Sequence, residues 1–443
     1  MDSWTEMSAA DLGRGIARGD IDPLALTQHF LARIAAHPHK DRIFTVVTAD
    51  RAIAEATAAA SRAQAGARLS PLDGVPISWK DLFDSAGTAT EAGSALLAGR
   101  RPDADAAVLG AATAMGLVCL GKTHMSELAF SGLGLNPITA TSPNVNDPGA
   151  VPGGSSSGAA ASVAFGLAAA AIGSDTGGSV RIPAAWNDLV GLKTTSGRIS
   201  LQGVVPLAAR FDTVGPLCRT VEDAALLLAA LEGGQAIDLS GTKDLAGRRF
   251  AILKTIADAD LRAAPRAAFT SALERLQNAG AEVVTFEFPD LALAYQEAGP
   301  LFPGEAYGTW RDQIEAAPDK MYPPILDRFR AGRDFSAPDF VAAWRRIDAI
   351  RADWAKATAE FDAVVCATSP IMPPNIDRLM NDEDYYVTEN LMALRNTRVG
   401  NLMGTSAITL PTGVPSCGIQ LIGPPMGEEA LLRLAVSVER ALA

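Results

Sequence analysis

The sequence has few residues of the kinds that bind metal ions or form disulfide frameworks. It contains four histidines and four cysteines in 443 residues, and no histidine follows His124. No two cysteines have the CxxC spacing, which excludes zinc-finger and dithiol redox motifs. Widely separated cysteines are more typical of buried thiols in a reducing compartment than of disulfides. His37 and His39 flank a proline and are expected in a surface turn, so we predict no metal and no cofactor.

Positive charge and long hydrophobic runs are also scarce. The 38 lysines and arginines are outnumbered by 50 acidic residues, and this net charge of −12 argues against nucleic-acid binding. The longest stretch of small apolar residues, 159–172, is interrupted by Ser162 and Gly166 and is too short to cross a membrane. The N-terminal segment lacks the basic start and apolar run of a secretory signal. We therefore expect a soluble cytoplasmic protein, monomeric or homodimeric, with neither nucleic-acid nor membrane partners.

The chain is organised as alternating strands and helices. Hydrophobic residues make up 48% of it, enough for a sizeable core. The pattern of residues 1–65 predicts N-terminal helices. That of residues 66–235 predicts short apolar strands that alternate with helices and glycine-rich turns. The alternation returns in residues 249–288, whereas residues 291–360 are mostly helical. This pattern is typical of α/β folds, and we predict a single large α/β domain over residues 1–443 with a helical insertion.

Two segments are rich in glycine and serine, Pro-Gly-Gly-Ser-Ser-Ser-Gly at 152–158 and Gly-Ser-Asp-Thr-Gly-Gly-Ser-Val-Arg-Ile-Pro at 173–183. Glycine lets a ligand approach the backbone, and consecutive N–H groups can bind an anion. A phosphate-binding loop is disfavoured because no lysine follows Gly158. A GxSxG elbow centred on Ser156 is excluded because that arrangement needs a histidine further along the chain. A structural glycine turn stays open for either segment alone.

A serine nucleophile needs a base, because its hydroxyl does not ionise unaided near neutral pH. With no usable histidine, the candidates are lysine and the acidic residues. Lys80 ends the apolar segment Val-Pro-Ile-Ser-Trp at 75–79. Burial at this position would disfavour the ammonium and lower the pKa of Lys80 towards the working range of a base. A solvated lysine at a strand end is the plainer alternative.

Several motifs together are similar to one known family. They are Leu-Asp-Gly-Val-Pro-Ile-Ser-Trp-Lys-Asp at 72–81, Gly-Lys-Thr-His-Met-Ser-Glu at 121–127, the two segments above, Val-Gly-Leu-Lys-Thr at 190–194 and Gly-Ile-Gln-Leu-Ile-Gly-Pro at 418–424. Their order and spacing resemble the amidase signature family. The resemblance implies a central mixed β-sheet flanked by helices on both faces. It also implies cleavage of the C–N bond of a small carboxamide, with the 291–360 insertion on the substrate side.

The resemblance further implies a Ser-cisSer-Lys triad. By motif, Ser179 is the nucleophile that forms an acyl-enzyme and Lys80 is the base. Ser155, in a cis peptide with Gly154, relays the proton between them. The oxyanion of the intermediate would be bound by consecutive backbone N–H groups, those of Thr176, Gly177, Gly178 and Ser179.

Other residues near these motifs are expected to support the site rather than to react. We interpret Asp175 and Arg181 as a paired structural brace of the loop, and binding of a substrate carboxylate by Arg181 is the alternative. His124 stands where many relatives have asparagine, and we expect it to pack near the pocket wall. The predicted substrate-binding residues are Met125, Phe130, Ser131 and Trp186.

The family includes simple amide hydrolases and the A subunit of a tRNA-dependent amidotransferase. A chain of 443 residues is shorter than that subunit usually is, and His124 replaces its asparagine. The stretch Arg-Asn-Thr-Arg-Val-Gly-Asn at 395–401 is more similar to stand-alone amidases. We therefore favour a stand-alone amide hydrolase, with a glutamyl/aspartyl-tRNA amidotransferase A subunit as the alternative. An inactive scaffold is disfavoured because Lys80, Ser155 and Ser179 are all present.

Overall fold

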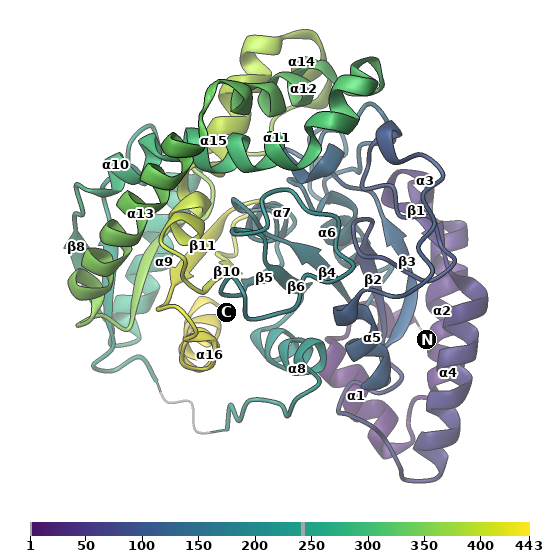
Figure 1. Cartoon of the computed structure of the whole chain (residues 1–443). Coiled ribbons are helices and arrows are strands. Elements are labelled where there is room, and N and C mark those ends of the chain that lie inside the picture. The colour runs from purple at the N-terminus through teal and green to yellow at the C-terminus, as the bar shows by residue number, and fades with distance from the viewer. Residues whose placement is uncertain (1, 241–243) are drawn as a thin grey trace.

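A mixed β-sheet of eleven strands lies at the centre of the computed structural model, which describes residues 2–240 and 244–443. The strands lie in the order β1-β3-β2-β4-β6-β5-β10-β11-β9-β7-β8 (Figure 1). Their bounds are Phe44–Val47 (β1), Pro76–Lys80 (β2), Val118–Thr123 (β3), Ala170–Ser174 (β4), Val190–Lys193 (β5), Val214–Cys218 (β6), Arg249–Leu253 (β7), Glu282–Phe286 (β8), Ala363–Ala367 (β9), Ala407–Pro411 (β10) and Gly418–Ile422 (β11). The sheet is flanked by helices, which confirms the predicted α/β fold.

The helices alternate with these strands along most of the chain. The α-helices are Ala9–Arg18 (α1), Pro23–Ala36 (α2), Lys40–Ile43 (α3), Ala49–Gln64 (α4), Ala107–Ala114 (α5), Ser157–Ala164 (α6), Arg181–Trp186 (α7), Val221–Glu232 (α8), Ala263–Asn278 (α9), Leu291–Gln296 (α10), Ala298–Ala316 (α11), Pro323–Arg330 (α12), Ala337–Thr358 (α13), Ile376–Asn381 (α14), Glu383–Leu402 (α15) and Glu428–Leu442 (α16). Short 3-10 helices are Asp2–Thr5 (η1), Ala95–Leu97 (η2), Glu127–Ala129 (η3), Pro318–Lys320 (η4) and Ala331–Asp334 (η5).

Local sequence signals place the first helices where they were predicted. The Ser8 hydroxyl accepts the Asp11 N–H at the start of α1, at 3.0 Å. Asp22 accepts the Ala25 N–H at 2.8 Å in the same way, and Pro23 occupies the first turn of α2. Such side chains satisfy N–H groups that have no partner inside the helix. Helices α2 and α4 pack on each other beside β2 and β3 and support that half of the sheet.

The parallel pairing of β2 and β4 brings two sequence motifs to one edge of the sheet. Trp79 of β2 lies opposite Ile172 of β4, and both strands are buried throughout. Strands buried on both faces are the usual state of parallel pairs inside an α/β protein. Because parallel neighbours end at the same edge, Lys80 and Ser174, the last residues of the two strands, come together.

The region 291–360 folds into helices α10 to α13, as the sequence predicted. Helices α11 and α12 lie beside α15 along the upper rim of the molecule in Figure 1. Phe302 of α11 stacks on Phe211 with ring centroids 4.1 Å apart, and Trp344 of α13 stacks on the same ring at 4.9 Å. This aromatic stack joins the helical region to the loop that precedes β6.

All four cysteines are free and buried in the structure. Burial raises the pKa of Cys119 and of Cys366 to about 11, so both stay protonated near neutral pH. Across the described residues, no helix combines the length and the apolar character needed to span a membrane.

Candidate active site

Lys80 reaches two serine hydroxyls from the end of β2. Its Nζ donates to Ser155 Oγ at 2.6 Å and to Ser174 Oγ at 2.8 Å, and the side chain is fully buried. Burial lowers the pKa of Lys80 to about 7, against the opposing attraction of Asp212 and Asp175. A lysine with this pKa is partly neutral near pH 7, which is the protonation state a base requires.

Ser155 lies in the tight turn that leads into α6. The Gly154–Ser155 peptide bond is cis, and the Ser155 carbonyl accepts the Ser126 N–H at 3.2 Å. A Cβ on Gly154 would lie 2.5 Å from the backbone nitrogen of Gly134, so the approach of these two segments requires glycine. The turn holds the fully buried Ser155 against Lys80.

Ser179 lies in the loop between β4 and α7. Its carbonyl accepts the Ser156 N–H at 3.2 Å, so the second glycine-rich segment packs directly on the first. Ser179 also lines a cavity of about 30 Å³, shared with Ser131, Thr176 and Gly177. The nucleophile candidate therefore faces open space, while Lys80 and Ser155 lie buried behind it.

The charged pair predicted as a brace is fully buried beneath this loop. Arg181 Nε and Nη2 each donate to a carboxylate oxygen of Asp175 at 2.9 Å. Arg181 Nη1 donates to Gln420 Oε1 at 2.6 Å, and Asn401 Nδ2 donates to Asp175 at 2.9 Å. Burial by itself would raise the pKa of Asp175, but Arg181 and Asn401 bring it down to about 2. Arg181 is occupied by protein acceptors, so the alternative of a substrate clamp is not supported.

The predicted oxyanion site differs from the structure at one position. The Gly178 N–H donates to Asp175 Oδ1 at 2.9 Å, so the carboxylate that braces the loop also takes up this donor. In the described part of the chain, the remaining N–H groups of Thr176, Gly177 and Ser179 have no protein acceptor. The structure thus leaves three backbone donors for an oxyanion instead of the four predicted.

Two of the four predicted pocket residues line the cavity. Phe130 and Ser131 do so, in the segment that follows η3. Trp186 packs instead in a hydrophobic cluster with Ile371, and its Nε1 donates to the Ile371 carbonyl at 3.3 Å. Met125 is likewise fully buried in the main core. Both are large apolar side chains, and their full burial in the core keeps them from the cavity wall.

His124 takes no part in the cavity wall. Its Nδ1 lies 3.3 Å from Thr139 Oγ1, and the residue is 8% exposed. Burial lowers the pKa of His124 to about 4, so the ring is neutral near pH 7. The described residues also contain no cluster of three or more histidine, cysteine or acidic side chains that could hold a metal ion.

Several residues of the site were not found by sequence reasoning. Ser174 is the second acceptor of Lys80, and the buried Asp212 accepts the Thr176 hydroxyl at 2.5 Å. Arg328 of α12 and Arg398 of α15 line the cavity beside Phe302. Ser174 lies inside the quoted motif and could have been found from the parallel register of β2 and β4. Arg328 comes from a distant helix and carries no local signal. Arg398 lies in the quoted stretch 395–401, but its place at the cavity depends on tertiary packing.

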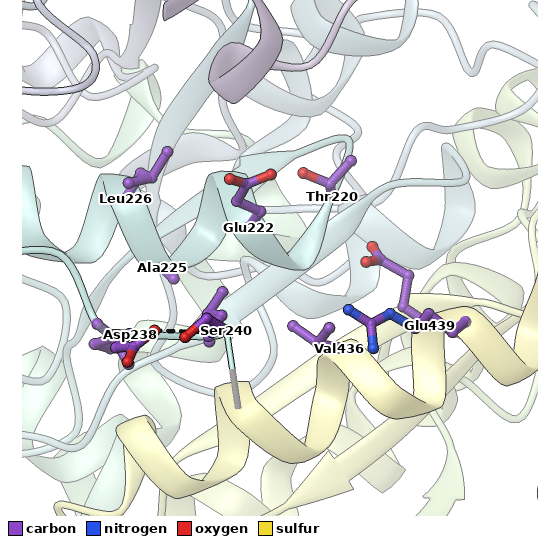
Figure 2. A pocket seen from close by; sticks show the side chains of 11 residues that line it. Thr220, Glu222, Ala225, Leu226, Asp238, Ser240, Val436 and Glu439 are labelled. Atoms are coloured by element: carbon purple, nitrogen blue, oxygen red, sulfur yellow. Dashed lines mark hydrogen bonds between the residues drawn. The ribbon is translucent and has the colours of Figure 1, made fainter. Parts of the chain in front are cut away.

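A second and larger cavity lies away from this chemistry. It has a volume of about 500 Å³ and lies between α8, residues 237–240 and α16 (Figure 2). Glu222 and Glu439 are on its wall, and the Ser240 N–H donates to Asp238 at 2.8 Å. It contains no lysine, and bonding to Ser240 lowers the pKa of its carboxylate Asp238, which makes Asp238 a weaker base. We therefore place the active site at the smaller cavity.

Comparison with known proteins agrees with this fold and site. The amidase family pattern matches residues 25–432. The A subunit of glutamyl-tRNA(Gln) amidotransferase from Chloroflexus aurantiacus is 34% identical over 96% of this chain and 94% of its own length. The 2-amino-5-chloromuconic acid deaminase of Comamonas testosteroni is also 34% identical, over 98% of this chain and 96% of its own. A crystal structure of an amidase has a TM-score of 0.87 and 29% identity, and covers 99% of this chain and 100% of that chain.

The fold, the site and these comparisons define an enzyme of the hydrolase class that acts on amide C–N bonds. More specifically, the chain belongs to the amidase family, the amidase signature proteins.

Proposed function

We propose that the chain is a stand-alone amide hydrolase that acts through an acyl-enzyme on Ser179. The observation that carries the proposal is the short hydrogen bond between Lys80 and Ser155, behind the cavity that Ser179 lines. In this mechanism Ser179 Oγ attacks the amide carbonyl and gives its proton to Ser155 Oγ. Ser155 passes its own proton to neutral Lys80 Nζ. A nucleophile activated through a chain of hydroxyls needs no histidine.

The second half of the reaction uses the same groups in reverse. The proton on Lys80 returns through Ser155 to the leaving nitrogen as the C–N bond breaks. Water then attacks the acyl-enzyme, gives a proton to the same path, and releases a carboxylic acid and Ser179. The N–H groups of Thr176, Gly177 and Ser179 are the donors available to the oxyanion. Loss of one such donor typically costs about 3 kcal/mol in the transition state.

The proposed substrate is a compact amide. The cavity beside Ser179 is about 30 Å³, so its walls must move to admit even a small amide, and a bulky substrate is disfavoured. Side chains from α11, α12 and α15 close it on the side of the helical region. We therefore propose the predicted substrate-side role for residues 291–360 and a single-domain organisation for residues 1–443.

The nucleophile is tested by a pair of serine variants. Ser179→Ala should abolish turnover of small amides and labelling by a fluorophosphonate probe, because the attacking hydroxyl is lost. Ser156→Ala is the matched control: its hydroxyl donates to the Ser174 carbonyl at 3.2 Å and takes no part in the proposed relay. Peptide mapping of the labelled protein should identify Ser179. Full activity of Ser179→Ala, or label on Ser156, would contradict the proposal.

The amidotransferase A subunit is the second candidate, because several relatives with 30–34% identity carry that name. The two functions differ in what the purified chain does alone. A stand-alone hydrolase releases ammonia or an amine from small amides without partner or tRNA. Inactivity of the chain alone, with ammonia release from glutamine restored by partner subunits, would favour the second candidate.

A further inference from the structure

One buried carboxylate binds two separate walls of the cavity that Ser179 lines. Asp212 Oδ1 accepts the Thr176 hydroxyl at 2.5 Å, and Asp212 Oδ2 accepts the Leu207 N–H at 2.9 Å. Thr176 and Leu207 both line the cavity, whereas Asp212 is buried, with 5% of its surface exposed. The N–H of Thr176 is one of the three donors left for the oxyanion. Asp212 therefore ties the first residue of the oxyanion segment, 176–179, to the opposite wall of the cavity.

The central sheet places Asp212 opposite Thr176. Strands β4 and β6 are antiparallel neighbours. Their pairing continues beyond the two strands, because Asp175 and Thr213 exchange both of their backbone hydrogen bonds, at 2.9 and 3.1 Å. Thr176 and Asp212 are the next residues across, and side chains that lie opposite each other on antiparallel segments are within reach of one another. The contact between them follows from the register of the sheet.

The carboxylate of Asp212 also acts on the charge of Lys80. Burial lowers the pKa of Lys80, and the attraction of Asp212 is the strongest influence that opposes it, followed by that of Asp175. Asp175 is bound at both oxygens by Arg181, so much of its charge is balanced. Among the described residues, the donors to Asp212 are one hydroxyl and two backbone N–H groups, all of them uncharged.

The other charges around Asp212 oppose one another. Glu305 of α11 lies near it, and burial and Asp212 both raise the pKa of Glu305, whereas Arg210 lowers it. Burial raises the pKa of Asp212 itself, while the hydrogen bond from Thr176 and the charge of Lys80 lower it. Both oxygens of Asp212 accept hydrogen bonds, as those of an ionised carboxylate do.

The proposed reaction creates a positive charge beside this carboxylate. When the proton of Ser179 arrives through Ser155, neutral Lys80 becomes an ammonium in a fully buried position. Burial disfavours a new charge, and a nearby charge of opposite sign favours it. Because its hydrogen bonds already hold Asp212 in place, it can stabilise the ammonium without rearranging.

We propose that Asp212 is a positioning residue with two effects: it fixes the oxyanion segment through the Thr176 hydroxyl, and its carboxylate stabilises the ammonium form of Lys80 during proton transfer. The proposal rests on the hydrolase function above. Loss of the first effect should lower kcat at every pH. Loss of the second should also change the pH at which the base becomes neutral.

Asp212→Asn tests both effects, because it removes the charge and nearly keeps the shape of the side chain. Without the carboxylate the ammonium form of Lys80 is less stable, so the midpoint of the kcat/KM profile should move to lower pH by about one unit. The plateau should nevertheless fall about 10- to 100-fold, because Lys80 is then a weaker base and the oxyanion segment is held less well. A purely structural role of Asp212 would not move the midpoint.

Thr176→Val separates the two effects. It removes the hydroxyl that Asp212 accepts and keeps the charge, so kcat should fall about tenfold while the midpoint stays near the wild-type value. Asp223→Asn is the matched control. Asp223 is another fully buried acid, but it accepts the Ala10 N–H at 2.8 Å at the start of α8 and does not line the cavity. This variant should keep the wild-type midpoint and kcat.

A fluorophosphonate probe supplies a readout besides amide cleavage, because its reaction with Ser179 needs the same base. The labelling rate of Asp212→Asn, measured from pH 5 to 10, should move to lower pH in the same way. A wild-type midpoint in Asp212→Asn, an equal change in Asp223→Asn, or wild-type kcat in Thr176→Val would overturn the role of Asp212 and leave the hydrolase intact. If Asp212→Asn does not fold, the kcat of Thr176→Val decides.

The opposite combination of results would overturn the hydrolase instead. In that case the probe labels Ser179 and the labelling profile of Asp212→Asn moves to lower pH, but the wild-type chain cleaves no amide. The role of Asp212 in activating the nucleophile would then stand.

Discussion

Two buried lysines show why a lowered pKa alone does not define a catalytic base. Burial lowers the pKa of both Lys80 and Lys193 to about 7. Lys193 Nζ donates to the backbone carbonyls of Thr194 and Thr405, at 2.9 and 2.6 Å, which cannot relay a proton. Lys80 instead meets two hydroxyls that can both donate and accept. Its partners, more than its burial, make it the candidate base.

The pH dependence of activity should follow the ionisation of Lys80. Since the base must be neutral, kcat/KM should rise with pH through about 7 and reach a plateau above it. Lys80→Ala should lower kcat by about 10²- to 10⁴-fold, and its residual activity should keep rising with pH as hydroxide replaces the base. Initial rates measured from pH 5 to 10 check both statements.

Lys193→Met tests whether the pH dependence of activity comes from Lys80 or from any buried lysine with a lowered pKa. The variant should keep the wild-type midpoint, because Lys193 is bonded only to carbonyl groups. A profile with the wild-type midpoint in Lys80→Ala would remove Lys80 from the mechanism.

Sequence reasoning could predict residues that lie within recognisable motifs, and it missed the roles that depend on packing between distant segments. Lys80 and Ser155 were placed in one site, and the structure puts their side chains in contact. The role of Asp175 as acceptor of the Gly178 N–H was not foreseen, because the direction of a loop N–H depends on the folded turn. Arg328 and Arg398 lie on helices whose positions depend on tertiary packing, so even the quoted stretch 395–401, which contains Arg398, did not show that this side chain lines the cavity.

At the scale of elements, long periodic helices and apolar strands were predicted well, and short interrupted strands were missed. Residues 66–235, predicted to alternate apolar strands with helices, contain β2 to β6 and α5 to α8. Strands β5 and β6 were not predicted as strands. They contain Gly191, Gly215 and Pro216, residues that weaken a strand pattern. A Cβ on Gly215 would lie 1.9 Å from the Leu192 carbonyl oxygen, so the close approach of β5 and β6 requires glycine. The same glycine weakens the pattern by which a strand is predicted from sequence.

The aromatic stack between the helical region and the core is expected to support the substrate cavity. Phe211→Ala should remove the ring on which Phe302 and Trp344 both stack. Loss of a buried phenylalanine typically costs about 3 to 5 kcal/mol of unfolding free energy. Because Phe302 lines the cavity, KM should rise more than kcat falls. Denaturant unfolding and steady-state kinetics measure the two effects.

Phe340→Ala is the control for this stack. Phe340 contacts Trp344 at 6.3 Å between centroids but is partly exposed and does not line the cavity. It should lose less stability and leave KM near the wild-type value. Equal KM values for both variants and the wild type would show that the stack does not shape the cavity.

At the scale of the whole molecule, one continuous sheet links the first and last thirds of the chain. The order of its strands places β10 and β11, from the C-terminal part, between β5 and β9. The Asp175–Arg181 brace likewise reaches Asn401 and Gln420, far along the chain. The active loop is therefore held by segments that only the complete fold brings together, which a scan for local motifs does not capture.

The reactivity of the four buried cysteines can be used to follow unfolding of the protein. They lie on β3, on β6, on β9 and just before β11, which are spread across the sheet. A thiol reagent such as DTNB should find no rapidly reacting group in the native enzyme and four in guanidinium chloride. If the sheet opens as one unit, the four should be released together and with the loss of the far-ultraviolet dichroism signal. One thiol that reacts well before the others would show that its part of the sheet unfolds locally, independently of the rest. Since no engineered label is needed, thiol exposure and enzyme activity can be measured on the same unmodified protein.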